Sequence, residues 1–165
     1  METITSLHHS RGLVIVWLIG MILLGAVFTC GVHAAKHEPL LQLLTAEEAA
    51  RPEEKSYGFA SPQPDNGPFI GVPKLEVTEG KPFALVVRLT PRDGAGPDPA
   101  TLRVECLKSP AIDLTSRVRP YVSLEGLNID RVTLPAGLYH FRVSVSDVQG
   151  RLSEKDFTIL VSGAF

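Results

Sequence analysis

The sequence has very few cysteine and histidine residues, and this scarcity excludes several kinds of chemistry. Its two cysteines are Cys30 and Cys106, and Cys30 falls in an apolar N-terminal stretch. A disulfide framework or a Cys-x-x-Cys metal or redox site is therefore excluded in the rest of the chain. Beyond residue 34 the only histidines are His37 and His140. Two histidines are too few for a histidine-rich zinc site, so we expect an apolar core alone to stabilise the fold.

The chain also lacks an excess of charge of either sign. Its formal net charge is −2, and 44% of its residues are hydrophobic. That balance argues against disorder throughout. It also gives no basis for nucleic-acid binding, which needs clustered lysines and arginines to neutralise phosphates. The 165 residues allow one domain of ordinary size with appendages.

Motifs of the common enzyme mechanisms are missing as well. No Gly-x-Ser-x-Gly sequence is present, so the turn that exposes a hydrolase serine is absent. The glycines at 94 and 96 precede no expected helix, which argues against a phosphate-binding loop. Several aspartates fall in or near expected turns, where aspartate is ordinary, so no catalytic pair of carboxylates can be named. We expect a protein that is not an enzyme, with no catalytic residues and no cofactor.

The N-terminus carries the features of an export signal. Residues 13–28 are almost entirely apolar, and no charged side chain occurs between Arg11 and Lys36. Val32 and Ala34 occupy the −3 and −1 positions of a cut after Ala34, as in a secretory signal peptide. An uncleaved membrane anchor is the alternative, because residues 13–32 approach the ~20 apolar residues of a spanning helix. We interpret residues 1–34 as a signal peptide or signal anchor that exports the rest of the chain.

Cleavage after Ala34 would create a new N-terminus that begins Ala35, Lys36 and His37. Its free amine, two backbone amides and the imidazole could form a square-planar set of nitrogens. Cu(II) and Ni(II) favour that geometry. One hypothesis for function is therefore a periplasmic copper- or nickel-binding protein that uses these three residues.

Residues 35–68 form a different kind of segment, between the leader and the expected domain. Four leucines at positions 40, 41, 43 and 44 precede Thr45 and Glu48, which are spaced for a capping box. We expect a short helix over Ala46–Arg51 that Pro52 stops, followed by a proline-rich linker up to Pro68. The leucines could pack on their own domain, on a membrane surface or on a partner.

From residue 69 to the C-terminus the apolar residues repeat with a period of two. Alternation is clearest in Lys81–Thr90, Thr101–Leu107 and Leu138–Asp147. Weaker strands are expected over Ile70–Val77, interrupted at Pro73, and over Arg117–Val122. About seven strands at short spacing, with turn residues between them, predict an all-β fold, a two-sheet antiparallel sandwich over residues 69–165. Cys106 falls on the inward face and is expected to be an inert core thiol.

The last part of this domain resembles a known family. Residues 134–143 read Leu-Pro-Ala-Gly-Leu-Tyr-His-Phe-Arg-Val, and Asp147, Gly150 and a Phe-x-Ile-x-Val run from Phe157 follow them. This pattern resembles the end of a bacterial immunoglobulin-like domain, and cadherin-like and fibronectin type III-like domains share it. The resemblance covers about residues 69–163. It implies an immunoglobulin-like sandwich in which the hydroxyl of Tyr139 bonds to nearby backbone. It implies little about function.

The function that fits these observations best is that of an exported, non-enzymatic adaptor. We expect it in the periplasm or at the outer face of a bacterial inner membrane, in contact with another envelope protein. Five arginines form the candidate interaction surface: Arg103, Arg117, Arg119, Arg131 and Arg142. A carbohydrate-binding sandwich is a further hypothesis, which the few aromatic residues after the leader weaken.

Overall fold

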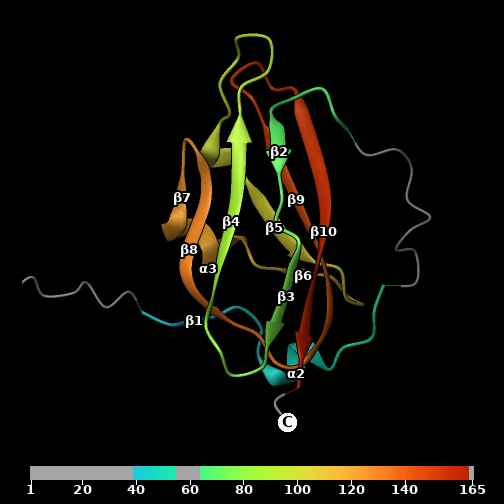
Figure 1. Ribbon diagram of the computed structural model, residues 1–165. Helices are drawn as coiled ribbons and strands as arrows, with labels where there is room; N and C mark the ends of the chain where they lie inside the picture. Colours follow the sequence, from blue (N-terminus) through green and yellow to red (C-terminus); the bar gives the residue numbers. More distant parts are fainter. Residues whose placement is uncertain (1–38, 55–63, 164–165) are drawn as a thin grey trace, which may run out of the picture. The chain divides into compact units, whose positions relative to one another are not determined.

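The computed structural model describes residues 39–54 and 64–163, which form two packed β-sheets (Figure 1). The first sheet has the order β1-β8-β4-β2, and β7 also pairs with β8. Its strands are β1 (Leu41–Gln42), β2 (Phe69–Gly71), β4 (Phe83–Thr90), β7 (Val122–Ser123) and β8 (Gly126–Thr133). The second sheet has the order β3-β10-β9-β5-β6. Its strands are β3 (Leu75–Thr78), β5 (Arg103–Cys106), β6 (Ile112–Asp113), β9 (Gly137–Ser146) and β10 (Leu152–Ser162). The fold is the all-β sandwich that the period of two predicts.

Two edge strands run parallel to their neighbours, which departs from the purely antiparallel sandwich that we expected. β1 pairs in parallel with β8, and β3 pairs in parallel with β10. The second case follows from Pro73, because proline has no N–H to donate to a sheet. The segment predicted as one interrupted edge strand becomes β2 in the first sheet and β3 in the second. The predicted interruption at Pro73 is therefore the point where the chain changes sheets.

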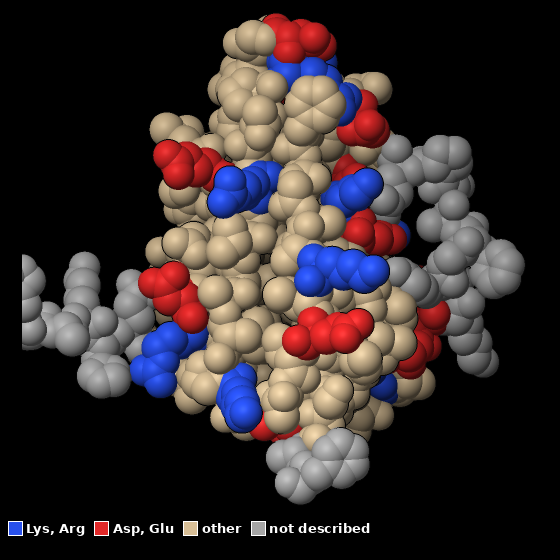
Figure 2. Space-filling view, in the orientation of Figure 1, with Lys and Arg blue, Asp and Glu red and all other residues tan. Residues whose placement is uncertain are grey.

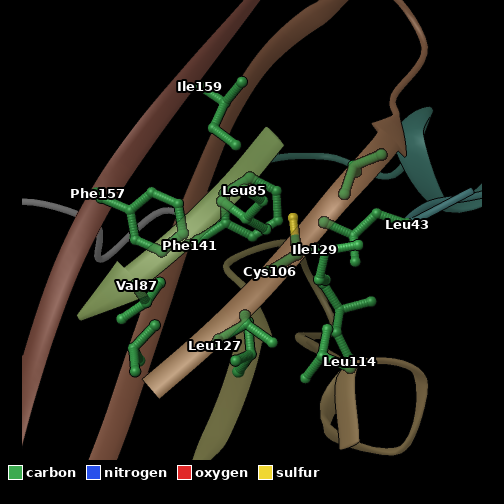
Figure 3. Packing of buried hydrophobic residues seen from close by; sticks show 14 of the residues in the cluster. Leu43, Leu85, Val87, Cys106, Leu114, Leu127, Ile129, Phe141, Phe157 and Ile159 are labelled. Atoms are coloured by element: carbon green, nitrogen blue, oxygen red, sulfur yellow. The ribbon is translucent and has the colours of Figure 1, made fainter. Parts of the chain in front are cut away.

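The inward residues of the alternating strands form one apolar core between the sheets (Figure 3). Phe141 of β9 is fully buried, and its ring stacks on Phe157 of β10 at a centroid distance of 5.2 Å. Leu85 and Val87 of β4 face them from the first sheet, and both are buried. The tight turn between β9 and β10 ends at Gly150, whose φ of 80° favours glycine. The sequence predicts these inward faces correctly.

The strand predicted over Arg117–Val122 is wrong. Residues 115–121 instead form one helical turn, α3 (Thr115–Val118), and a 3₁₀ turn, η2 (Arg119–Tyr121), and only Val122 enters a strand. The carboxylate of Asp113 accepts a hydrogen bond from the Thr115 amide at 2.8 Å, which favours a turn at that point. Proline at position 120 is tolerated because the first residues of such a turn need no N–H donor. Another 3₁₀ turn, η1 (Pro99–Thr101), precedes β5.

Residues 39–54, which we call the arm, pack against residues 64–163, which we call the body. Leu43 and Leu44 are fully buried and belong to the same core as the body's strands. Thr45 and Glu48 form both hydrogen bonds of the predicted capping box at the start of α2 (Ala46–Ala49). Of the three surfaces that the leucines could contact, Leu43 and Leu44 pack on their own domain, whereas Leu40 is exposed.

Parts of the predicted linker also pair with the body. Glu53 forms a β-bridge with Lys108, and Asp65 forms one with Ser153. Within residues 39–54 and 64–163 no helix is long and apolar enough to cross a membrane. The predicted leader, residues 1–34, lies outside the described residues, so its cleavage and the domain boundaries that depend on it stay predictions.

Candidate interaction surface

Arg142, on the outward face of β9, is bound within the second sheet. Its Nε and Nη2 donate to the two carboxylate oxygens of Asp156 on β10 at 2.8 and 3.0 Å. That hydrogen bonding raises the pKa of Arg142. Glu105 of β5 lies opposite Arg142 on the other side. The guanidinium therefore completes a cross-strand row of charges.

Arg117, at the end of α3, fastens the arm to the body. Its guanidinium donates to both carboxylate oxygens of Glu48 at 2.6 and 2.8 Å, and to the carbonyl of Leu43 at 2.7 Å. The hydrogen bond from Arg117 is the main reason that the pKa of Glu48 falls to about 2. Both terminal nitrogens of the Arg117 guanidinium thus have partners within the chain.

Of the remaining candidate arginines, Arg103 lies on β5, Arg119 in η2 and Arg131 on β8. Arg119 donates to the carbonyls of Pro99 and Ala100 at 3.0 and 3.1 Å, and Arg103 is exposed on β5. The pKa of Asp113 is lowered first by hydrogen bonds from Thr115 and then by the charges of Arg103 and Arg119. The charges of both arginines therefore act on Asp113 of β6, Arg103 from β5 and Arg119 from η2. Arg131 is half-buried on β8 of the first sheet, away from that set.

Cys106 and Tyr139 are both buried in the core and have structural roles. Burial raises the pKa of the Cys106 thiol to about 12, which keeps it protonated and inert, as predicted. The hydroxyl of Tyr139 donates to the carbonyl of Pro135 at 3.0 Å, so the bond to nearby backbone that the resemblance implies is confirmed. The Nζ atom of Lys108 lies 5.2 Å from the centre of the Tyr139 ring and pairs with Glu53 of the arm.

The predicted metal ligands Ala35, Lys36 and His37 lie outside the described residues, and the metal hypothesis stays a prediction. In the part of the chain that the structure describes, no three histidine, cysteine or acidic side chains cluster closely enough to hold a metal ion. His140 lies on the outward face of β9, where its Nδ1 is 3.3 Å from the hydroxyl oxygen of Thr158.

A shallow groove of about 570 Å³ crosses the outer face of the first sheet, and the sequence did not single it out. It is lined by residues 86–90 of β4, by Ser123 and by residues 125–128 at the start of β8. Arg88 and Glu125 are its charged residues, and both are exposed. Alternation places Arg88 outward on its strand, but only strand pairing brings Glu125 beside it. In Figure 2, charges of both signs are scattered over this side of the molecule among larger uncharged areas.

Comparison with known proteins gives a structural likeness and no family. No protein-family model matches the chain, and no curated protein matches it. Among solved structures, the chain is similar to the crystal structure of CopC from Methylosinus trichosporium OB3b. The TM-score is 0.40 and the sequence identity 17%, over 59% of this chain and 96% of that chain.

Proposed function

We propose that this protein is an exported, non-enzymatic module with an immunoglobulin-like fold that binds another protein of the bacterial envelope. Strand order supports the fold assignment. The order β2-β4-β8-β7 corresponds to strands A-B-E-D of an immunoglobulin sandwich, and β10-β9-β5 corresponds to G-F-C. Tyr139 stands near the start of the strand equivalent to F, two residues before the buried Phe141, where the corner tyrosine is expected.

The non-enzymatic role is supported by where the ionisable groups with shifted pKa values lie in the fold. Active sites gather groups of shifted pKa in a cleft. Here the shifted groups belong to separate structural contacts. Glu48 holds the arm, Arg142 bridges two strands, and Cys106 is sealed in the core. Asp147 caps the β9–β10 turn. Burial raises its pKa, but hydrogen bonds from Arg151 and Gln149 outweigh that effect, so the pKa lies below its ordinary value.

The contact surface proposed for the partner is the β5–β6 edge. Arg103 and Arg119 lie there with Asp113, while Arg117 and Arg142 are already bound to carboxylates within the chain. A pair of exposed arginines is suited to carboxylates on a partner, because the guanidinium fork matches carboxylate geometry. The partner is therefore a protein with an acidic patch.

The test places a photo-crosslinking amino acid at position 103 of the full chain in its native cells. We expect a single discrete adduct with an envelope protein, and we expect Arg119→Glu to weaken it. The matched control carries the same amino acid at position 74, where Lys74 is exposed outside the proposed surface. No adduct from position 103, or equal adducts from both positions, would contradict the proposed surface.

Export is tested separately by the intact mass of the mature protein. A mass that begins at Ala35 shows a cleaved leader, and a mass that includes residues 1–34 shows an anchor. A full-length protein that fractionates with the cytosol would contradict export.

A further inference from the structure

Phe69, the first residue of β2, keeps half of its aromatic side chain in contact with water. Its exposed fraction is 52%, whereas Phe141 and Phe157 are buried in the core. The ring lies over the guanidinium of Arg92, whose central carbon is 3.9 Å from the ring centre. Arg92 in turn donates to the main-chain carbonyl of Asp65 and, at 3.0 Å, to its carboxylate. The half-exposed ring is therefore held on a fixed support.

A pocket of about 330 Å³ lies beside this stack, between β2 of the first sheet and β10 of the second. Its volume falls in the range of small-ligand sites, about 300–1,000 Å³. Besides the three residues of the stack, four residues line it: Ile70 of β2, and Ser153, Glu154 and Lys155 of β10. Distant parts of the sequence thus meet in one hollow that includes the exposed ring.

The polar groups of this pocket break two patterns that hold elsewhere in the body. Along β10 every second residue from Phe157 to Val161 is apolar and buried, but Lys155 continues that inward series and is exposed. A charge at an inward position is unusual unless it has a function. Within residues 39–54 and 64–163, Nε of Arg92 is the one buried side-chain nitrogen or oxygen without a hydrogen-bond partner. Since buried donors are almost always paired, this wall has hydrogen-bonding capacity that the chain does not use.

The charges of the pocket indicate which class of ligand it suits. They are two carboxylates and two cations, those of Asp65, Glu154, Arg92 and Lys155. A charged ligand would be attracted by one pair and repelled by the other. An entirely apolar ligand would remove water from these groups and give them no partner. A neutral molecule with an apolar face for Phe69 and several hydroxyl groups meets all of these conditions, because hydroxyls both donate and accept.

We propose that this pocket binds one sugar unit of a neutral polysaccharide. The C–H face of the sugar ring stacks on the ring of Phe69, as aromatic faces favour. Hydroxyls of the sugar donate to the carboxylates of Asp65 and Glu154 and accept from the ammonium of Lys155. The carboxylate of Asp65 is available for this contact, because its side chain is 72% exposed although it pairs with Arg92.

The first experiment adds neutral tetrasaccharides to the natural full chain in a mild detergent and follows the amide signals by NMR. The sugars are tetramers of glucose with α-1,4 or β-1,4 linkage and of N-acetylglucosamine with β-1,4 linkage. We expect at least one to bind with a dissociation constant below about 1 mM. The signals that shift should be those of residues 65–70, 92 and 153–155. Absence of binding by all three sugars, or shifts confined to other residues, would overturn the proposal.

The second experiment repeats the titration with variants. Phe69→Ala removes the stacking surface and is expected to raise the dissociation constant by about tenfold or more. Val148→Ala is the matched control, because Val148 is an exposed apolar residue outside the pocket. Lys155→Met keeps the length of the side chain without its donors and should weaken binding by about threefold or more. Lys74→Met, at an exposed lysine outside the pocket, should bind like the natural chain.

An unchanged dissociation constant in Phe69→Ala would also overturn the proposal, because the sugar would then bind elsewhere. Circular dichroism checks that each variant is folded, and the amide shifts of the natural chain give the answer if one is not. The result goes beyond the proposed protein contact and is independent of it. Crosslinking from position 103 reports on β5, which β9 separates from β10, so either proposal can fail alone.

Discussion

The arm and the body are held in place by different means. In the body, β9 and β10 form an antiparallel pair ten residues long, and buried side chains alternate along both strands. The arm has a strand of two residues, two buried leucines and two carboxylates, Glu48 and Glu53, that meet body cations. Stabilisation of the body is therefore spread over many contacts, whereas that of the arm depends on a few. A single substitution should release the arm and leave the body folded.

The largest effect is expected for Phe141→Ala in the body. Phe141 is fully buried in the core. Loss of its ring would leave a large cavity beside Phe157 and Leu85. We expect the free energy of unfolding to fall by about 3–5 kcal/mol. Urea denaturation of the full chain, followed by far-ultraviolet circular dichroism, measures this free energy. A loss under 1 kcal/mol would show that the two sheets do not share this core.

Leu44→Ala in the arm is expected to cost less, about 2–4 kcal/mol, because Leu44 is also fully buried but its segment can detach. Hydrogen exchange of the full chain distinguishes the two regions. Amides of residues 43–50 should lose protection, while those of β9 and β10 keep theirs. Equal loss of protection in arm and body would contradict separate behaviour.

Glu48→Gln is expected to lower the free energy of unfolding by about 1–2 kcal/mol, since it removes a charge-assisted pair that water partly screens. The folded pKa of about 2 lies below the ordinary value of 4.5, so this contribution is present above pH 4.5 and is lost as the pH falls toward 2. The difference between the natural chain and the variant should therefore vanish across that interval. Glu47→Gln is the matched control, because Glu47 is exposed on the same turn. A pH-independent difference would contradict the role of the charge.

The smallest effect is expected for Tyr139→Phe, which removes one hydrogen bond in the body and leaves the ring in place. We expect a loss of about 1 kcal/mol, the usual net contribution of one neutral hydrogen bond to stability. Hydrogen exchange should rise in residues 134–139 and stay unchanged in the arm. A loss of arm protection would show that Lys108, above the Tyr139 ring, transmits the change to Glu53.

The sequence predicts the parts of this fold that local periodicity determines. The strands β4, β5, β9 and β10, the inert thiol of Cys106 and the capping box at Thr45 follow from neighbouring residues alone. The helical turns over residues 115–121 were missed because Arg117–Val122 also fits an alternating pattern. The side chain of Asp113 and its bond to Thr115 decide between the two forms.

The candidate surfaces were harder to predict because they depend on pairing between distant segments. Five arginines looked equivalent in the sequence, yet Arg117 meets Glu48 across 69 positions and Arg142 meets Asp156 across a hairpin. The groove on the outer face of the first sheet is lined by residues of β4 and of the β7–β8 turn, which only strand pairing brings together. No local pattern contains that information.

The change of sheet at Pro73 also has a mechanical consequence. It places β3 parallel to the final strand β10, with four residue pairs in register from Leu75 to Thr78. Tension applied to the start of β3 and the end of β10 pulls these strands along their length in opposite directions. All the hydrogen bonds between them then bear load together instead of opening one after another. A domain stretched between a tether and a bound partner would resist that force in shear.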